Sequence, residues 1–263
     1  MIGIGGDAGR DPGRLRHALR DADERAVIVH AAGSVAIGPP LEAAYLDSTR
    51  SLFEAVAAVR PRATIVTLGS VAEVLPLDSP YARIKRRQAA IAAQHAEALG
   101  VRWRHLRLHN LVGPGTPPTL APAAIAIRLR RVIVEDRGCL AVSHGEAVRD
   151  WLDVRDAARM VLALADRVDR LDAGEAIEVC SGVGRSVRSV AETLVAISGA
   201  SVEIAEEVEP SGSDRSGEAR VVVGDPRGLR GWLGAVARPR IAFERSLRDL
   251  WEAIGEVGQE PVS

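Results

Sequence analysis

The chain has 263 residues, a net charge of −1 and a sequence pI of about 6.6, so its charge gives no reason to expect nucleic acid or an anionic membrane as a partner. No apolar run is long enough to span a bilayer and the N-terminus lacks the profile of a signal peptide, so a cytoplasmic protein is expected. Cys139 and Cys180 are too few for a disulfide framework or a zinc site, and the six histidines lack metal-ligand spacing, so no metal is expected.

Apolar segments rich in Val and Ile alternate with longer amphipathic segments in the first part of the chain. Strands are predicted at 26–33, 63–70 and 101–110, and helices at 41–60 and 81–100. Continuous apolar strands joined by helices are typical of a parallel sheet that is covered on both faces. With right-handed crossovers, the expected fold is α/β with a doubly wound parallel sheet, which binds ligands at the carboxyl ends of its strands.

The pattern changes after Asn110. Residues 111–122 contain four prolines and two glycines, which predicts an ordered loop that leaves the sheet. The remaining predicted elements are helices at 154–167, 185–199 and 245–257, a strand at 176–182 and a polar, flexible flap at 206–220. We expect a core domain of 1–110, continued by about 150–182, and a second lobe that consists of 111–149 and 183–263.

Lys85 is the only lysine of the chain, and it follows Tyr81, one of two tyrosines, by four residues. On a helix these two side chains share a face. The ordinary pKa of tyrosine is about 10, and a nearby ammonium group favours the phenolate and lowers that pKa, which suits Tyr81 to general acid/base work. A surface tyrosine beside a solvated lysine is the other interpretation. Because every other Lys/Arg position is arginine, the functional interpretation is favoured.

With Ser70 at the end of the preceding strand, this pair resembles the Ser and Tyr-x-x-x-Lys triad of the extended short-chain dehydrogenase/reductases, a superfamily of nucleotide-sugar epimerases, dehydratases and reductases. The resemblance implies a Rossmann-like core, a smaller C-terminal substrate-binding lobe, an NAD or NADP cofactor and a homodimer. It also implies that Ser70, Tyr81 and Lys85 are catalytic. Ser70 would hold the substrate oxygen, Tyr81 would exchange a proton with that oxygen, and Lys85 would bind the cofactor ribose.

Two further segments extend the resemblance. VIVHAAG resembles the strand whose small residues, here Ala31, Ala32 and Gly33, let the backbone approach the cofactor; Tyr81 and Lys85 would complete the cofactor-binding residues. LRLHNLVGPG resembles an Arg-x-x-Asn-x-x-Gly-Pro segment, so Asn110 would contact the sugar or the diphosphate of the substrate.

Two arginines match phosphate-binding positions of the superfamily. VRDWLDVRDAARM resembles its Arg-Asp-aromatic segment, which implies that Arg149 binds a diphosphate. Arg215 stands ten residues before Asp225, as the second phosphate-binding arginine does. Guanidinium groups bind phosphate oxygens bidentately, although each arginine taken singly also fits a surface ion pair. The segments NLVGPGTPP and RDWLDVRDAAR are most similar in sequence to the GDP-4-keto-6-deoxymannose reductase branch of the superfamily.

Only 25 residues precede the strand at 26–33, and they resemble a Gly-Asp-x-x-Asp-Pro-x-x-Leu segment that lies just before that strand in the superfamily. This interpretation predicts a chain truncated at its N-terminus, without the first β-α-β-α segment and its glycine-rich phosphate loop. A second interpretation takes Gly3, Gly6 and Gly9 as that loop, followed by a short helix to about Asp23. The stretch Arg10-Asp11-Pro12 interrupts the start of such a helix, which favours the truncated interpretation.

Three functions follow from these observations. The resemblance implies an NAD(P)-dependent epimerase, dehydratase or reductase that acts on a nucleotide sugar or a similar hydroxylated small molecule. Tyr45 and Ser48 stand where the superfamily has Asn and Gly, which weakens support for its proton relay. The alternative is a cofactor-independent dehydratase, isomerase or cyclase that keeps the triad after losing dinucleotide binding. A non-catalytic relative is the third hypothesis, and the lone lysine argues against it.

Overall fold

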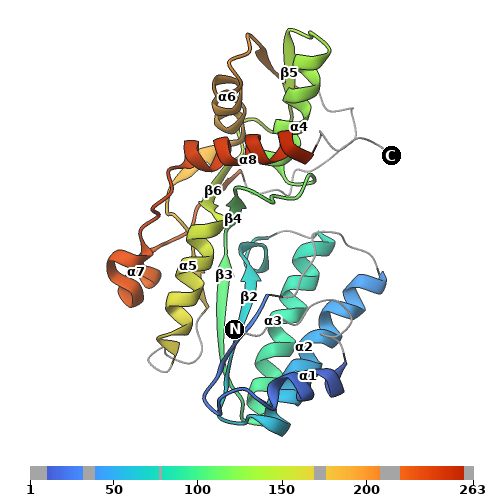
Figure 1. Ribbon diagram of the computed structural model, residues 1–263, viewed down its shortest axis with the longest axis vertical. Coiled ribbons are helices and arrows are strands. Elements are labelled where there is room, and N and C mark those ends of the chain that lie inside the picture. Colours follow the sequence, from blue (N-terminus) through green and yellow to red (C-terminus); the bar gives the residue numbers. More distant parts are fainter. Residues whose placement is uncertain (1–10, 32–38, 77–78, 169–175, 208–219, 258–263) are drawn as a thin grey trace. The chain divides into compact units, whose positions relative to one another are not determined.

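The structure is a computed structural model that describes residues 11–31, 39–76, 79–168, 176–207 and 220–257 (Figure 1). The chain divides into two compact units, Met1–Leu108 with Val161–Glu178 and His109–Met160 with Val179–Ser263. The predicted phosphate loop at Gly3, Gly6 and Gly9 and most of the predicted flap lie outside the described residues. None of the helices in the described ranges is long and apolar enough to cross a membrane.

A sheet with the strand order β1-β2-β3-β7, in which β1, β2 and β3 are parallel, forms the centre of the first unit. The predicted strands are confirmed, with bounds that the structure gives as β1 Val27–His30, β2 Thr64–Ser70, β3 Arg102–Leu108 and β7 Ile177–Val179. The register aligns His30 of β1 with Thr67 of β2, and Thr67 with His105 of β3. These three polar residues therefore form a row across the sheet, from the carboxyl end of β1 to the middle of β2 and β3.

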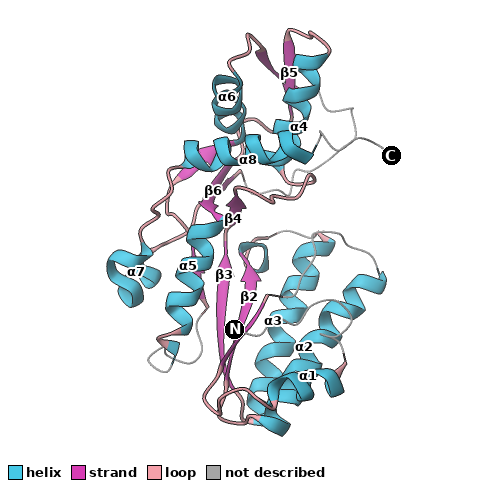
Figure 2. Ribbon diagram, in the orientation of Figure 1, coloured by secondary structure: helices cyan, strands magenta, loops and turns pink. Residues whose placement is uncertain are grey.

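Three helices pack beside this sheet, and the short 3-10 helix η2 (Val71–Glu73) follows β2 (Figure 2). The helices are α1 Pro12–Leu19, α2 Pro39–Val59 and α3 Pro80–Leu99. The apolar faces of the three helices meet β2 in one buried cluster, in which Phe53 of α2 and Ile65 of β2 are fully buried. This layer of helices on a parallel sheet confirms the predicted α/β class.

Helix α1 begins at Pro12, within the stretch that the sequence analysis took as an interruption of a helix. The Asp11 side chain is the N-cap and accepts hydrogen bonds from the N–H groups of Gly13 and Arg14, at 2.8 and 3.3 Å. Pro12 occupies the first helical position, where its missing N–H costs nothing and its fixed φ suits the helix. The interpretation of Asp11-Pro12 as an interruption is therefore wrong, because these two residues start the helix.

Helix α3 places the Tyr-x-x-x-Lys pair. Ser79 caps its N-terminus by accepting from the N–H of Ala82 at 3.1 Å, and Pro80 is the first helical residue. At the other end Gly100 adopts a φ of 64°, in the left-handed region that glycine occupies without a steric penalty, and closes the last turn. The start of α3 is therefore fixed, with Tyr81 in its first turn and Lys85 one turn later.

The second unit contains two small sheets. The strand order β10-β6-β4 is parallel, β8 pairs with β6 in the antiparallel sense, and β5 pairs with β9 in parallel. The bounds are β4 Asn110–Val112, β5 Cys139–Val142, β6 Val148–Asp153, β8 Gly184–Ser186, β9 Glu203–Glu206 and β10 Val221–Val222. The sequence predicted none of these strands by pattern, because each is short and only partly apolar.

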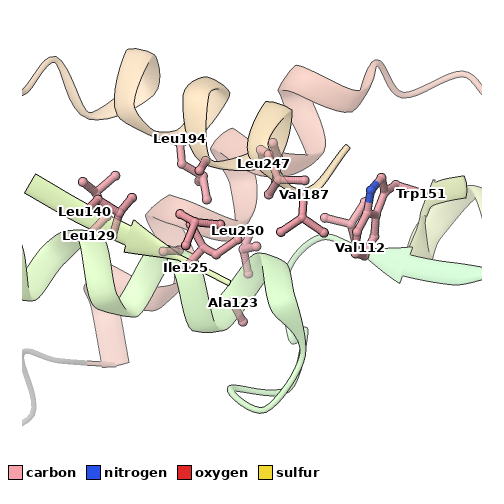
Figure 3. Close-up of a cluster of buried hydrophobic side chains, with 14 of the residues drawn as sticks. Val112, Ala123, Ile125, Leu129, Leu140, Trp151, Val187, Leu194, Leu247 and Leu250 are labelled. Atoms are coloured by element: carbon pink, nitrogen blue, oxygen red, sulfur yellow. The ribbon is translucent and has the colours of Figure 1, made fainter. Parts of the chain in front are cut away.

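Helices α4, α6 and α8 enclose the core of the second unit (Figure 3). The helical bounds are α4 Ala121–Val134, α5 Val154–Ala165, α6 Val187–Ser198, α7 Arg227–Leu233, η4 Gly234–Ala237 and α8 Phe243–Val257. Each enclosing helix contributes a fully buried leucine to this cluster: Leu129 from α4, Leu194 from α6 and Leu247 from α8. The predicted helices at 154–167, 185–199 and 245–257 are confirmed as α5, α6 and α8.

Candidate active site

Ser70 and Tyr81 are brought together by the end of β2 and the first turn of α3. The Ser70 side chain caps η2 by accepting from the N–H of Ala72 at 3.2 Å. The hydroxyl groups of Ser70 and Tyr81 form a hydrogen bond that lowers the pKa of Tyr81. A bond that favours the phenolate is one in which Ser70 donates its hydrogen to the phenol oxygen. The structure therefore joins two of the three predicted catalytic residues directly.

Lys85 is buried, with 7% of its surface exposed, and lies among polar groups of α2 and α3. Its ammonium group donates to the Gln88 side chain at 3.1 Å, and Gln88 in turn donates to the hydroxyl of Thr49 at 3.1 Å. The Lys85 nitrogen also lies 5.4 Å from the ring centroid of Tyr45, within the range of a cation–π contact. The aromatic residue that replaces the superfamily's Asn therefore faces the lone lysine.

The pKa of Tyr81 lies above its usual value. Burial raises this pKa, the hydrogen bond from Ser70 lowers it, and the negative charge of Glu73 raises it. The prediction that Lys85 leaves the Tyr81 pKa depressed is therefore wrong, since the net direction is upward. A phenol with a raised pKa is protonated at neutral pH, so Tyr81 rests in its proton-donating form.

His30 and Tyr45 complete the titratable groups near Lys85. Burial and the positive charge of Lys85 lower the pKa of His30 to about 4, so His30 is neutral at pH 7. Burial and the neighbouring Tyr81 raise the pKa of Tyr45 to about 12. Burial lowers the pKa of Lys85, and Glu73 acts in the opposite direction. Burial thus pushes each of these three groups toward its neutral form.

Glu73 and His105 are two site residues that the sequence analysis did not single out. One carboxylate oxygen of Glu73 accepts from the Ser70 backbone N–H at 2.7 Å, and the other lies 2.8 Å from Nε2 of His105. The Ser70-x-x-Glu73 spacing is a capping-box signature, and the structure forms that box. This spacing was the available signal for Glu73, whereas His105 becomes visible only when the strand register is known.

The residues around Lys85 fit one end of a nicotinamide cofactor. An ammonium group has three N–H donors, and the described residues give Lys85 one hydrogen bond, to Gln88. The remaining donors suit the hydroxyl groups of a ribose. Of the small residues predicted to approach the cofactor, only Ala31 is among the described residues. Ala31 is exposed and directly follows β1. Ala32 and Gly33 lie outside the described residues.

Two of the predicted substrate-binding residues lie on neighbouring strands of the second unit. Asn110 opens β4 and is aligned with Trp151 of β6, and Arg149 lies two residues before Trp151. The Arg149 guanidinium donates to the backbone oxygens of Val148 and Arg220, at 2.9 and 3.4 Å. Arg215 is not among the described residues.

Asp150, next to Arg149 on β6, forms hydrogen bonds with two loops. Its side chain is fully buried and accepts from the N–H groups of Ser181, Gly182 and Gly224, at 2.9, 2.8 and 3.3 Å, and from the Ser181 hydroxyl at 2.6 Å. A buried carboxylate is tolerated when its oxygens are satisfied in this way. Asp150 therefore holds the backbone on both sides of the strand that carries Arg149.

Residues 10–180 match the family described as the NAD dependent epimerase/dehydratase family, and the chain belongs to that family. Among known structures, RMD from Pseudomonas aeruginosa complexed with NADPH superimposes with a TM-score of 0.78 at 23% identity, over 95% of this chain and 87% of that one. DesIV, a dTDP-glucose 4,6-dehydratase from Streptomyces venezuelae, gives a TM-score of 0.75 at 22% identity, over 94% of this chain and 78% of that one. These likenesses confirm the Rossmann-like fold.

Two characterised relatives have named activities. A dTDP-6-deoxy-L-talose 4-dehydrogenase (NAD(P)(+)) of Kitasatospora kifunensis is 29% identical over 262 residues, which cover 92% of this chain and 79% of that enzyme. A GDP-6-deoxy-D-mannose reductase of Pseudomonas aeruginosa is 30% identical over 200 residues, which cover 70% of this chain but only 62% of the reductase. The predicted similarity to a deoxymannose reductase branch is confirmed by the second relative.

Proposed function

We propose that this chain is an NAD(P)-dependent enzyme of the epimerase, dehydratase or reductase type that acts on a nucleotide sugar, with Tyr81 as its general acid/base. The observation that carries the proposal is the placement of three residues: Ser70 ends β2, Tyr81 lies in the first turn of α3 with a side-chain hydrogen bond to Ser70, and the buried Lys85 follows one turn later. Family membership and two relatives named as nucleotide-sugar dehydrogenase and reductase support it. A bound nicotinamide would supply or accept the hydride.

The chain's own residues would move the proton. During reduction of a keto group, Tyr81 would give its phenolic hydrogen to the carbonyl oxygen while Ser70 orients that oxygen. The phenolate left behind would be stabilised by the hydrogen that Ser70 donates. The positive charge of Lys85, one helical turn away on α3, would add to this. In the opposite direction the phenolate would take the hydroxyl proton of the sugar. The raised pKa of Tyr81 favours the first direction at neutral pH.

The second unit carries two of the proposed substrate-binding residues. Asn110 and Arg149 lie on adjacent strands of one sheet, and we propose that they contact the sugar and the diphosphate, with Arg215 as a second phosphate ligand. A guanidinium group suits a diphosphate because its fork of N–H donors matches two phosphate oxygens. In the described residues Arg149 donates to neutral backbone oxygens, which a phosphate would replace as stronger acceptors.

A turnover assay tests this proposal. The purified chain is incubated with NADH or NADPH and a panel of GDP-, dTDP- and UDP-linked 4-keto sugars, and nicotinamide absorbance is followed. We expect oxidation of the reduced cofactor with at least one of these substrates. Product formation from a nucleotide sugar without added or co-purified nicotinamide would instead support the cofactor-independent alternative. No product with any of these nucleotide sugars, from a folded protein that binds cofactor, would contradict the substrate class.

A further inference from the structure

We propose that Glu73 and His105 form a positioning pair for the Ser70–Tyr81 site, which orients the Ser70 hydroxyl and favours proton donation by Tyr81 over proton uptake. The inference rests on the proposed function, because that function gives Tyr81 the proton. Neither residue needs to contact the substrate. Both would act through Ser70 and through the electric field at the phenol.

Glu73 is held in one orientation by contacts on both of its oxygens. Its side chain is 5% exposed, with one oxygen 2.7 Å from the Ser70 backbone nitrogen and the other 2.8 Å from Nε2 of His105. The Arg107 guanidinium lies 3.6 Å from the second oxygen. Burial raises the pKa of Glu73, but the hydrogen bond and the charge of His105, the hydrogen bond from Ser70 and the charge of Arg107 together lower it by more, so the net pKa is below its usual value and the carboxyl group is ionised.

A chain of hydrogen bonds fixes the tautomer of His105. The Trp103 indole can only donate, and it donates to the Thr67 hydroxyl at 2.8 Å. The Thr67 oxygen lies 2.7 Å from Nδ1 of His105. The ionised Glu73 carboxylate, which can only accept, lies 2.8 Å from Nε2, so Nε2 carries a hydrogen. A neutral imidazole that accepts at Nδ1 carries its hydrogen on Nε2, which then points at Glu73. Each hydrogen bond in this series, from Trp103 through Thr67 and His105, is thus donated in the direction of the Glu73 carboxylate.

Gly69 makes room for the pair. A Cβ atom at position 69 would collide with both the Glu73 carboxylate and the His105 ring. Position 69 must therefore be glycine for the Glu73 carboxylate to reach the His105 ring. The strand register places His105 beside Thr67, and the close approach at Gly69 lets His105 contact the carboxylate that holds the Ser70 backbone.

The pair acts on Tyr81 in two ways. The Glu73 oxygen holds the Ser70 backbone while the Ser70 hydroxyl oxygen accepts from Ala72, which leaves the hydroxyl hydrogen for Tyr81. The negative charge of Glu73 opposes formation of the phenolate and raises the pKa of Tyr81. The other titratable and charged groups around Glu73, Tyr81 and Lys85 are His105 and Arg107 of β3, Tyr45 of α2, His30 of β1 and Arg86, whose guanidinium donates to the Glu73 backbone oxygen.

The consequence for the reaction is a shift in its pH dependence. In reduction a hydride from the nicotinamide would form the new C–H bond, the carbonyl π electrons would take the Tyr81 proton, and solvent would later reprotonate the phenolate. Oxidation needs the phenolate at the start, and the Glu73 charge makes that form less populated. We therefore expect the pair to move the pH at which oxidation of the alcohol becomes fast to higher values, while the equilibrium between keto sugar and alcohol is unchanged.

Direct titration of Tyr81 in the protein without cofactor tests the pair. Tyr45→Phe leaves Tyr81 as the only tyrosine, so the ultraviolet absorbance of tyrosinate reports this one phenol. In that background Glu73→Gln keeps the side-chain size and removes the charge, and we expect the ionisation midpoint to move to lower pH. Glu97→Gln removes an exposed carboxylate from the same unit and is expected to leave the midpoint unchanged. An unchanged midpoint in Glu73→Gln, or equal shifts in both variants, overturns the proposal.

Turnover provides the second readout. Glu73→Gln is expected to slow carbonyl reduction by about tenfold to a hundredfold, the effect of a misplaced reacting group, with little change in KM for the nicotinamide. An unaltered reduction rate contradicts the pair. If the parent chain itself neither binds cofactor nor turns over, the proposed function fails, whereas the tyrosine titration still decides whether Glu73 controls Tyr81.

A measurement on the unaltered protein does not depend on whether Glu73→Gln folds. Nitrogen NMR reports which imidazole nitrogen carries hydrogen, and the signals that disappear in His105→Gln identify His105. We expect a hydrogen on Nε2, the nitrogen that faces Glu73. A ring with its hydrogen on Nδ1 alone would reverse the donor direction at Glu73 and contradict the proposed chain.

Discussion

Tyr81→Phe is expected to lower turnover by about 100-fold to 10,000-fold, the usual contribution of a positioned general acid. The substitution removes one oxygen and leaves the ring, so the packing of this partly buried side chain is kept. Cofactor binding should persist, because Lys85 and the end of β1 are untouched. The comparison is made in the nicotinamide-coupled assay, with the dissociation constant of NADPH measured on the same preparation.

Tyr45→Phe is the matched control for this experiment. It also removes one phenolic oxygen near Lys85, but it preserves the ring that lies 5.4 Å from the ammonium. We expect much smaller loss of turnover in this variant than in Tyr81→Phe. Equal activity of Tyr81→Phe and the parent chain would remove Tyr81 from the mechanism and leave the Ser70–Tyr81 contact as a structural feature.

Asp150→Ala is expected to destabilise the second unit by about 3–5 kcal/mol. The fully buried carboxylate accepts from three backbone N–H groups and one hydroxyl, and its removal leaves these donors without an acceptor in a buried site. The loops at Ser181–Gly182 and at Gly224 would then detach from β6. The free energy of unfolding is measured by urea denaturation, followed by circular dichroism.

Asp47→Ala serves as the matched control for Asp150→Ala. Asp47 is exposed and pairs with Arg50 at 2.7 Å, a surface contact of the kind that contributes about 0–1 kcal/mol. We expect its removal to change the free energy of unfolding by less than about 1 kcal/mol. Similar losses in the two variants would mean that the hydrogen bonds of Asp150 contribute no more than a surface ion pair.

The sequence carried enough information to predict the frame of the first unit. Buried strands rich in Val and Ile alternate there with long helical segments, and Gly100 marks the end of α3. These signals are local, so the strands β1, β2 and β3 and the helices α2 and α3 were predicted close to their observed bounds, whereas α1 was not expected to begin at Pro12. The second unit was harder, because strands of two to six residues with mixed burial have no clear period of two.

The Tyr81–Lys85 pair was visible because helical spacing alone places these two residues on one face. Glu73 and His105 were not singled out, since their contact depends on a 3-10 turn and on the register between β2 and β3. The direction of the Tyr81 pKa was missed for the same reason. The sequence showed a neighbouring cation, whereas the fold adds burial and the charge of Glu73, which act the other way.

Helix α1 shows how one local pattern supports opposite conclusions. Asp11-Pro12 was interpreted as a break, because proline inside a helix removes a hydrogen bond. At the first helical position the same two residues form a cap and a start. The difference lies in where the helix begins: Asp11 stands just outside it as the cap, and at the first helical position the missing N–H of Pro12 costs nothing.

The most direct test of the proposed function is a titration of the purified 263-residue chain with NADH and NADPH, followed by nicotinamide fluorescence. Preparations are first checked for co-purified cofactor. We predict saturable binding of at least one of the two, weakened when Lys85 is replaced by Ala. A folded chain that binds neither cofactor at millimolar concentration would contradict the nicotinamide-dependent function and leave acid/base chemistry at Tyr81 without a redox partner.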